Sequence, residues 1–509
     1  MRRRKVSAGS AGPAAGRGGR ATGVSTSWHD ATALSLAALL PEARFIGARD
    51  ILASEVCDTV EACGPGRIFV ARLRPDGDGH DDVPAAVAAG VAGICVERMV
   101  PAAGVPQCLV ADTTWAIARL RQAFAGEPSR SLNVVAVTGT SGKSTTCWLA
   151  AAALSEAGHR VGILSDLGCL GPDDDGPAAA DLTRPEIFAA WLARLAAAGC
   201  THAVVEVSSV MLAGHLLAGV TCDSVVVTNL GEAHLEEHGT RRAYHAVKVR
   251  AVEALVPEGC LISGVDGRRD AFLTRRLPAG GRLITAGLAA DRDVRATPVE
   301  GSLFGRTVLT ICGGKTVPLT LDTPTVPFLR DALLALAVAA RYGVASEVAV
   351  RGIEAAGRIS ARAERLDRGQ DAAIFLDTPT SGHALAATLA SLRRLTPGRL
   401  AVLAEAGVVD DLGEATFDRL VARHADAAAV APGTILADDP VEADLAAYAR
   451  VDRLLASLGP GDCCLVLGLT LRFSGPPDTP GGHFPLAMLV DAWLQVAEAT
   501  DPGAVRPAA

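Results

Sequence analysis

Residues 137–146, VTGTSGKSTT, carry the residue types of a loop that binds phosphate. The apolar run VVAVTG that leads into them predicts a strand, and STTCWLAAAAL after them predicts a helix. The N–H groups of such a turn and of the helix N-terminus point to one spot, which favours an anion. Lys143 adds a positive charge there, and Ser144 offers a hydroxyl to Mg²⁺. An ordinary turn is the alternative, but a strand, Gly-Lys-Ser and a helix in this order favour a nucleotide site.

Three further residues could hold a metal ion beside this loop. Glu206 ends the apolar strand AVVEV, His234 follows the next strand in TNLGEAHLEEHG, and Lys248 lies in the predicted helix AYHAVKVRAVEAL. Side chains at the carboxyl edge of a parallel sheet face the ligand crevice, and Mg²⁺ prefers oxygen ligands such as a carboxylate. Taken alone, Glu206 could be a solvated strand end, His234 a loop histidine and Lys248 a surface lysine.

The stretches VTGTSGKSTT, HAVVEVSS, VVVTNLGEAHLEEHGT and AYHAVK together resemble the Mur ligases, which are ATP-dependent amino-acid ligases of peptidoglycan precursor synthesis. The common phosphate loop, G-x-x-x-x-G-K-[ST], would need glycine at Val137, whereas the shortened Mur ligase loop G-T-x-G-K-[ST] fits this chain. The resemblance implies an ATP site formed by Gly139, Thr140, Ser141, Gly142, Lys143, Ser144, Thr145 and Asp377.

The same resemblance implies a metal site and a set of catalytic residues. Ser144, Glu206, His234 and a carbamylated Lys248 would hold Mg²⁺, and Lys143, Lys248 and His234 would act in catalysis. Carbamylation is chemically sensible, because an ammonium group cannot bind a cation whereas its carbamate is a carboxylate and can.

Within the family, the sequence most resembles the ligases that add a third residue, often diaminopimelate or lysine, to UDP-N-acetylmuramoyl-L-alanyl-D-glutamate. The region around Asp78-Gly79-His80 resembles their nucleotide-sugar domain, LTRPEI resembles their T-T-P-E stretch, and RAER resembles their R-x-E-R stretch through Arg362, Glu364 and Arg365. The resemblance implies that the UDP-muramoyl peptide is bound by Asp78, Gly79, His80, Thr183, Ser208 and Ser209.

The third region departs from the family pattern. GTILADDP stands where the family has D-N-P-R, GLTLR stands for G-K-G-H-E, the F-N-x-x-N stretch is missing from VPFLRDALLALA, and Thr380 replaces a histidine. Two alternatives to a third-residue ligase therefore stay open. One is a regulatory protein that binds nucleotide or muramoyl peptide without catalysis, and the other is the ligase that adds the terminal dipeptide, because NLGEAHLE also resembles that enzyme.

The order of apolar strands and Ala-rich helices predicts an α/β protein with the three-domain Mur ligase architecture. We expect a disordered basic tail at 1–27, a UDP-sugar-binding domain at 28–130, a central ATP-binding domain with a P-loop and a parallel sheet at 131–345, and a divergent, doubly wound C-terminal α/β domain at 346–509. TVLTICGGKTVPLTL predicts a hairpin that turns at Gly313-Gly314.

Composition limits the possible partners and compartment. The chain has 509 residues, a net charge of -8 and 4% aromatic residues, which disfavours nucleic acid as a partner. The basic N-terminus lacks the apolar stretch of a signal peptide, no run of about 18 apolar residues predicts a membrane span, and the cysteines form no C-x-x-C pair. We expect a cytoplasmic monomer that uses ATP, Mg²⁺, a UDP-N-acetylmuramoyl peptide and an amino acid, with no nucleic acid or membrane partner.

Overall fold

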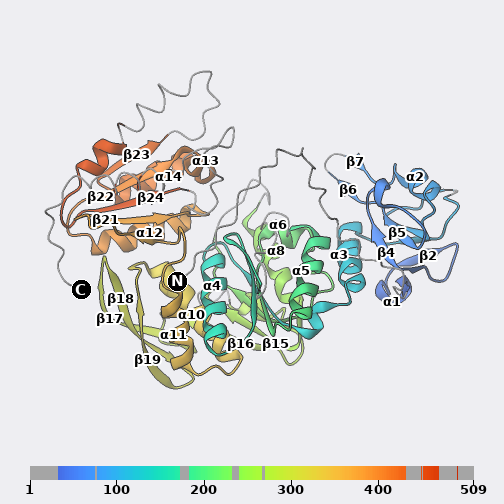
Figure 1. The fold of residues 1–509 in the computed structure, drawn as a ribbon, viewed down its shortest axis with the longest axis horizontal. Coiled ribbons are helices and arrows are strands. Elements are labelled where there is room, and N and C mark those ends of the chain that lie inside the picture. Colours follow the sequence, from blue (N-terminus) through green and yellow to red (C-terminus); the bar gives the residue numbers. More distant parts are fainter. Residues whose placement is uncertain are drawn as a thin grey trace, which may run out of the picture.

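Three α/β domains follow one another along the length of the molecule in the computed structural model (Figure 1). The structure describes residues 33–74, 77–101, 103–171, 183–231, 240–265, 270–431, 449, 451–468, 486, 490 and 494. The tail predicted at 1–27 and the predicted metal ligand His234 lie outside these residues. Within the described part of the chain, no helix is both long and apolar enough to cross a membrane.

The N-terminal domain is built on a five-stranded sheet with the order β2-β9-β8-β5-β4. All neighbouring strands of this sheet are parallel except β2 and β9. The elements of the domain are β1 (Leu34–Ser35), α1 (Leu36–Leu39), β2 (Arg44–Ile46), β3 (Leu52–Ala53), β4 (Glu55–Cys57), β5 (Arg67–Val70), β6 (Leu73–Arg74), β7 (Gly77–Asp78), α2 (Val83–Ala88), β8 (Gly93–Val96), β9 (Gln107–Leu109) and α3 (Thr113–Phe124).

The central domain contains a ten-stranded sheet with the order β12-β11-β13-β10-β14-β15-β16-β17-β18-β19. Its strands are β10 (Asn133–Thr138), β11 (Val161–Ser165), β12 (Gly168–Leu170), β13 (His202–Glu206), β14 (Cys222–Val227), β15 (Leu255–Ser263), β16 (Arg282–Gly287), β17 (Val294–Ser302), β18 (Gly305–Cys312) and β19 (Lys315–Leu321). Across the sheet, the strands from β11 through β13, β10, β14, β15 and β16 to β17 run parallel. Strand β12 pairs antiparallel with β11, and β17, β18 and β19 form successive antiparallel hairpins. The carboxyl ends of β10, β11, β13 and β14 therefore meet at one edge.

The predicted hairpin is confirmed. Strands β18 and β19 pair antiparallel, with Cys312 opposite Lys315. The two turn residues, Gly313 and Gly314, have φ angles of 58° and 78°. A two-residue turn that matches the twist of the strands needs positive φ at both positions, which explains why two glycines stand there.

Helices cover both faces of the central sheet. They are α4 (Lys143–Glu156), α5 (Pro185–Ala197), α6 (Ser209–Ala213), α8 (Arg241–Glu253), α9 (Asp270–Thr274), α10 (Val326–Arg341) and α11 (Ser346–Ala356). Successive residues of β10 belong to opposite cores, Val135 and Val137 to one and Val134 and Ala136 to the other. This explains the uninterrupted apolar run of the strand, because both of its faces are buried.

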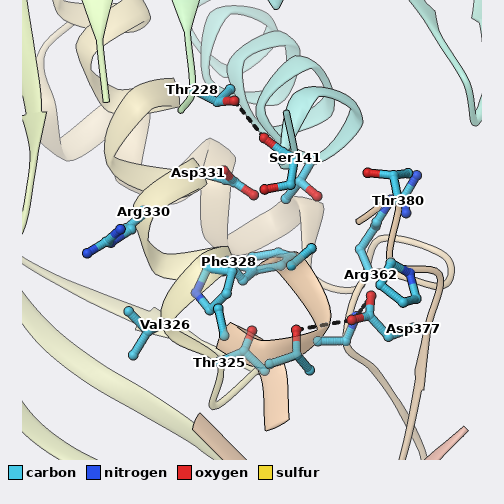
Figure 2. A pocket seen from close by; sticks show the side chains of 18 of the residues that line it. Ser141, Thr228, Thr325, Val326, Phe328, Arg330, Asp331, Arg362, Asp377 and Thr380 are labelled. Carbon is cyan, nitrogen blue, oxygen red and sulfur yellow. Dashed lines mark hydrogen bonds between the residues drawn. The ribbon is translucent and has the colours of Figure 1, made fainter. Parts of the chain in front are cut away.

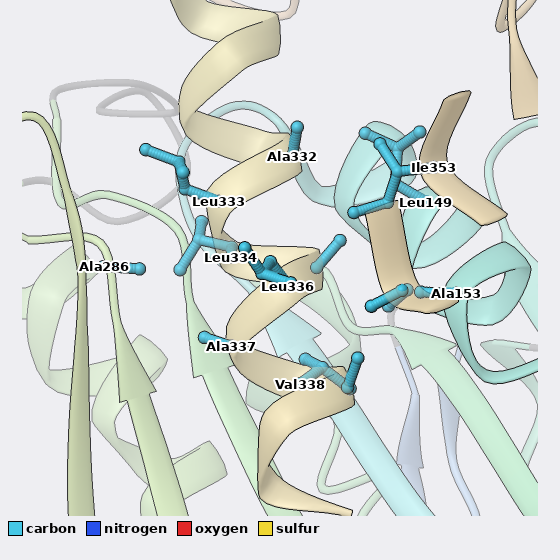
Figure 3. Close-up of a cluster of buried hydrophobic side chains, with 14 of the residues drawn as sticks. Leu149, Ala153, Ala286, Ala332, Leu333, Leu334, Leu336, Ala337, Val338 and Ile353 are labelled. Atoms are coloured by element: carbon cyan, nitrogen blue, oxygen red, sulfur yellow. The ribbon is translucent and has the colours of Figure 1, made fainter. Parts of the chain in front are cut away.

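Helix α10 lies at the centre of one of these two cores. Figure 3 shows it between the strand that carries Ala286 and the helices that carry Leu149 and Ile353. Helix α11 packs against α4 and β19. The boundary that we predicted after residue 345 therefore precedes a helix that packs with the central domain.

The C-terminal domain has a five-stranded sheet with the order β20-β21-β24-β22-β23, parallel except at its edge strand β20. Apolar clusters cover both faces, which confirms the doubly wound arrangement. The elements are β20 (Glu364–Leu366), β21 (Ala373–Asp377), α12 (Gly382–Leu395), β22 (Leu400–Glu405), α13 (Ala406–Leu412), α14 (Glu414–His424), β23 (Ala427–Ala431) and β24 (Cys463–Leu467).

The turn between β17 and β18, in the central domain, packs against the C-terminal domain (Figure 1). Leu303 in this turn is 7% exposed and belongs to the apolar core that contains Phe375 and Leu389. The neighbouring Phe304 ring lies 5.1 Å from the Arg365 guanidinium group, as measured to the ring centroid. The hairpin of one domain is thus anchored in the core of the next.

Candidate active site

The phosphate loop connects β10 to α4 and depends on two glycines. Gly142 has a φ angle of 79°, and a Cβ atom there would lie 2.2 Å from Asp331 Oδ1. Gly139 has a φ angle of 150°, and a Cβ atom there would lie 1.9 Å from Thr228 Oγ1. Both positions therefore exclude a side chain. The N-cap residue of α4 is Gly142, which has no side chain to cap the helix, so the N–H groups of the first turn can bind an anion.

Two residues that follow β14 hold the loop in place. The Thr228 hydroxyl donates a hydrogen bond of 2.6 Å to the Ser141 carbonyl oxygen. The Asn229 amide donates to the Ser141 carbonyl at 3.0 Å and to its hydroxyl at 3.1 Å, and the Ser141 N–H donates to Asn229 Oδ1 at 3.2 Å. Sequence reasoning assigned no role to either residue, although their place directly after a strand at the same sheet edge was a usable signal.

Thr140 connects the loop to α8. Its hydroxyl oxygen accepts hydrogen bonds from the Gly231 N–H at 2.9 Å and from the Tyr244 hydroxyl at 3.4 Å. Its own N–H donates to the Asn229 carbonyl oxygen at 3.2 Å. Thr140 is 2% exposed, and these hydrogen bonds stabilise the conformation of the loop.

Lys143 and Glu206 form the charged centre of the site. The Lys143 ammonium lies 3.6 Å from Glu206 Oε1, and the two side chains are 11% and 2% exposed. Burial raises the pKa of Glu206, but the Lys143 charge and the nearby Asp166 and Ser144 groups outweigh it, so that the pKa is lowered. Glu206 is therefore an ionised carboxylate in the interior of the protein.

Asp166, which directly follows β11, is a residue that sequence reasoning missed. Its N–H donates a hydrogen bond of 3.0 Å to Glu206 Oε2. Much of the residue is exposed, but desolvation of its carboxyl group and the charge of Glu206 raise the pKa of Asp166 to about 6. Position at the end of a parallel strand was again the signal that could have identified it.

Lys248 lies against the back of the phosphate loop and is 1% exposed. Its ammonium donates a hydrogen bond of 2.7 Å to the Gly139 carbonyl oxygen and lies 4.5 Å from the centroid of the Tyr244 ring. Burial and the charge of Lys143 lower the pKa of Lys248 to about 7, against the attraction of Glu206. The surface-lysine alternative is wrong, because the side chain is fully enclosed.

The oxygen atoms of Glu206 and Ser144 fit a hard cation. Glu206 Oε1 is buried and has no hydrogen-bond partner among the described residues. The Ser144 side chain is 4% exposed, and its hydroxyl is one of the groups beside Glu206 that lower the pKa of that carboxyl. An orphaned carboxylate oxygen beside a hydroxyl is a donor set that Mg²⁺ accepts.

A cavity of about 340 Å³ opens between the central and C-terminal domains in front of the loop. Figure 2 shows Ser141, Thr228 and Asp331 on the central-domain side and Arg362, Asp377 and Thr380 on the other. The further lining comes from the loop, from the segments that follow β11 and β14, and from α10 and α12, and it includes Lys143, Ser144, Thr145, Asp166, Asn229, Thr325, Phe328, Arg330, His383, Thr388 and Arg394.

Arg362 reaches the phosphate loop from the segment between α11 and β20. Its Nη2 donates a hydrogen bond of 3.2 Å to the Ser144 hydroxyl, and its Nη1 donates one of 2.5 Å to the Thr378 carbonyl oxygen. The flanking Ala361 and Ala363 both have a φ angle of 50°. Left-handed alanines are strained, and such strain is concentrated where a side chain must be aimed. The turn therefore directs Arg362 into the cavity.

Asp377 ends β21 and lines the cavity, as its predicted contact with the nucleotide requires. Its Oδ1 accepts hydrogen bonds from the N–H groups of Ala363 and Thr378, at 3.3 Å and 3.1 Å, and its Oδ2 accepts one of 3.2 Å from the Thr388 hydroxyl. Burial raises the pKa of Asp377. The carboxylate organises this wall of the cavity, and its contact with a nucleotide stays a prediction.

The predicted substrate residues Asp78, Gly79 and His80 lie in the N-terminal domain, outside the lining of this cavity. His80 Nδ1 is 2.7 Å from Asp78 Oδ1, and the Glu97 N–H donates to His80 Nε2 at 3.1 Å. Hydrogen bonds from the His80 N–H, Arg98 and the His80 ring hold the pKa of Asp78 well below its usual range. A Cβ atom at Gly79 would lie 2.7 Å from the backbone of Arg72. The three residues form one rigid turn.

The other predicted substrate residues lie at two helix starts of the central domain. Thr183 is exposed and precedes α5. Ser208 is the N-cap of α6 and accepts a hydrogen bond of 3.2 Å from the Met211 N–H. Ser209 is 4% exposed in the first turn of that helix. Neither serine lines the cavity at the phosphate loop.

Comparisons with known proteins agree with this arrangement. Residues 137–339 match the family model described as the Mur ligase middle domain. The chain is 31% identical over 378 residues to a UDP-N-acetylmuramyl-tripeptide synthetase from Roseiflexus sp. (strain RS-1), which covers 69% of this chain and 72% of that protein. It is 29% identical over 457 residues to a UDP-N-acetylmuramoyl-L-alanyl-D-glutamate--2,6-diaminopimelate ligase from Chlorobaculum tepidum, which covers 83% of this chain and 88% of that protein.

Solved structures show the same fold. A UDP-N-acetylmuramoyl-L-alanyl-D-glutamate--2,6-diaminopimelate ligase superimposes with a TM-score of 0.64 and 18% identity, over 86% of this chain and 93% of that one. A MurF ligase from Thermotoga maritima in complex with ADP superimposes with a TM-score of 0.55 and 19% identity, over 81% of this chain and 93% of that one. The chain therefore belongs to the Mur ligase family of ATP-dependent acid–amino-acid ligases.

Proposed function

We propose that this protein adds an amino acid to UDP-N-acetylmuramoyl-L-alanyl-D-glutamate, at the expense of ATP, in the synthesis of a peptidoglycan precursor. The observation that supports this most directly is the phosphate loop with Lys143 3.6 Å from Glu206, facing a cavity that Arg362 lines from the opposite side. The names of the two relatives favour the third residue of the peptide over the terminal dipeptide.

The proposed reaction has two steps. A carboxylate of the muramoyl peptide attacks the γ-phosphorus of ATP, which forms an acyl phosphate and releases ADP. The amine of the incoming amino acid then attacks the acyl carbon, so that the amide bond forms and phosphate leaves. Little covalent work falls to the protein, and the rate depends on positioning and on neutralising charge.

The residues of the cavity have the charges that these steps need. The N–H groups at the start of α4 and the Lys143 ammonium would hold the β- and γ-phosphates, and the Arg362 guanidinium would approach them from the other domain. Enclosure between two domains would keep water away from the acyl phosphate. The ADP complex of the MurF ligase named above supports a nucleotide in this type of site.

We propose that Ser144, Glu206, His234 and a carbamylated Lys248 hold Mg²⁺. Bound there, the ion would shield the phosphate charges from the incoming carboxylate. The orphaned Glu206 Oε1 supports this assignment. The charges of Lys143 and Glu206 both act on the enclosed Lys248 nitrogen, so a carbamate there would lie near the proposed ion. We also propose that the Asp78–His80 turn, Thr183, Ser208 and Ser209 contact the UDP-muramoyl peptide.

Phosphate release tests the proposal. Purified protein is incubated with ATP, Mg²⁺, UDP-N-acetylmuramoyl-L-alanyl-D-glutamate and one candidate amino acid at a time. We expect release that requires both the peptide and one particular amine. Lys143→Ala should lower the rate by on the order of 100-fold or more, because it removes a stabiliser of developing charge. Lys315→Ala is the matched control, since Lys315 is 61% exposed on β19 and pairs with Glu347 at 3.4 Å. Undiminished release by Lys143→Ala would refute the assigned role.

A regulatory protein without ligase activity is the second candidate. The observation that favours it is the replacement of the predicted acceptor motif by GTILADDP, a stretch that lies outside the described residues. If the protein is regulatory, it should bind ADP and ATP but release no phosphate with any amine. Release that depends on peptide and amine would exclude it.

A further inference from the structure

Asp166 places a second carboxylate beside Glu206 at the carboxyl edge of the central sheet. The two residues end the neighbouring parallel strands β11 and β13. The Asp166 N–H donates a 3.0 Å hydrogen bond to Glu206 Oε2, and the two carboxyl groups lie close to each other. Asp166 lines the cavity together with Ser144, whereas Glu206 is buried behind them at 2% exposure.

One ammonium group compensates this pair directly. Lys143 Nζ is 3.6 Å from Glu206 Oε1, and Arg362 adds a weaker attraction to Asp166 from across the cavity. If a nucleotide occupies the loop, its phosphates draw Lys143 and Arg362 to themselves. Two carboxylates would then face the phosphates at close range, and a divalent cation between them would balance their charge.

Glu206 itself points to the same conclusion. Its Oε1 is buried and accepts no hydrogen bond from any described residue, although a buried carboxylate oxygen is normally satisfied. The atom faces Lys143 at the start of α4, which is also where Ser144 offers its hydroxyl. A buried carboxylate oxygen that has an ammonium neighbour but accepts no hydrogen bond can still bind a metal ion at the phosphate site.

We propose that Asp166 and Glu206 form a two-carboxylate site for a divalent cation, in which Asp166 contributes an oxygen ligand from the cavity side. This inference rests on the proposed function, because it assumes that nucleotide binds at the loop. It adds Asp166 to the metal ligands that were predicted from the sequence.

Binding of Mn²⁺, followed by the electron paramagnetic resonance signal of the free ion, tests the assignment. The wild-type protein is titrated with Mn²⁺ in the presence of ADP, the Mn²⁺ bound by the same concentration of ADP without protein is subtracted, and the result is compared with Asp166→Asn. Loss of a carboxylate ligand should raise the Kd for Mn²⁺ by at least the roughly 10- to 100-fold that loss of an outer-shell partner costs at a metal site. Asp166→Glu, which keeps a carboxylate on a longer side chain, should recover part of this loss. Asp291→Asn removes a carboxylate that is 83% exposed and should leave the Kd unchanged.

The outcomes separate the assignment from the proposed function. An Asp166→Asn protein that binds Mn²⁺ as tightly as the wild type would overturn the assignment and leave the ligase proposal intact. A wild-type protein that binds no Mn²⁺ with ADP would overturn both. Recovery in Asp166→Glu guards against a folding defect. It would show that position 166 tolerates substitution and that the carboxylate group restores Mn²⁺ binding.

Discussion

Replacement of Gly142 by alanine should destabilise the phosphate loop, because the position has neither the backbone conformation nor the space for a side chain. The φ angle of Gly142 is 79°, and a Cβ atom would lie 2.2 Å from Asp331 Oδ1 and 2.7 Å from its Cγ. Asp331 is 6% exposed at the start of α10 and cannot swing into solvent freely. The substitution therefore has two costs with different causes.

The two costs can be separated by a double-mutant cycle. A left-handed conformation costs an alanine about 1–2 kcal/mol, whatever its surroundings. Relief of the overlap with Asp331 resembles the overpacking of a core, which costs about 1–3 kcal/mol. Gly142→Ala alone should therefore lose about 2–5 kcal/mol of unfolding free energy, but only about 1–2 kcal/mol in an Asp331→Ala background.

Urea denaturation of the four proteins, followed by tryptophan fluorescence, measures the cycle, and titration with ADP shows whether the loop still binds nucleotide. Trp148 on α4 lies close to the substituted position and reports on this part of the protein. Gly407→Ala is the matched control: this glycine lies in α13, and a Cβ atom added to it would have no neighbouring atom within 4 Å and no left-handed backbone to adopt. Equal losses in both backgrounds would refute the overlap with Asp331, and complete recovery would refute the backbone cost.

Other contacts predict further effects. Asn229→Ala removes three hydrogen bonds to Ser141, each worth about 1 kcal/mol, so that ADP binding measured by calorimetry should weaken by about 10-fold or more. An unchanged Kd would show that the loop holds its shape without them. Leu303→Ala empties a buried site in the C-terminal core and should cost about 2–5 kcal/mol, seen as faster proteolysis of that domain. Equal proteolysis rates would show that the hairpin does not anchor it. Desolvation and the charge of His159 lower the pKa of His202 from 6.5 to about 4. The unfolded chain then takes up this proton at higher pH than the folded one, so the wild type should lose about 2 kcal/mol of unfolding free energy between pH 7 and pH 5, and His202→Phe should lose less. Identical pH dependence of the two urea midpoints would exclude this imidazole as the cause.

Local patterns were sufficient for the parts of the fold that depend on neighbouring residues. The shortened phosphate loop, the apolar strand before it and the helix after it were all predicted, as was the turn at Gly313-Gly314. The loop and the turn need left-handed glycines, and the strand has both of its faces buried. These rules act within a few residues. The alternation of strands and helices predicted the doubly wound C-terminal domain for the same reason.

The partners of the predicted site residues could not be predicted in this way. Sequence reasoning named Glu206 and Lys248, but the structure shows that Lys248 donates to the Gly139 carbonyl, 109 residues away. It also places Asn229 on the loop and Arg362 beside Ser144, and neither contact has a local pattern. The helix α11 likewise looks like the start of a new domain in the sequence, yet it packs on α4 and β19.

Side-chain type and local backbone sterics are enough to identify the chemical groups of this protein and the short segments that form strands, helices and turns. Which of these groups meet depends on the folded chain as a whole. The order of strands in the central sheet brings the ends of β10, β11, β13 and β14 to one edge, and thereby sets Asp166 beside Glu206 and Asn229 beside Ser141. That order is selected by the burial of two whole faces of the sheet, which is a property of the entire domain and of no single stretch of residues.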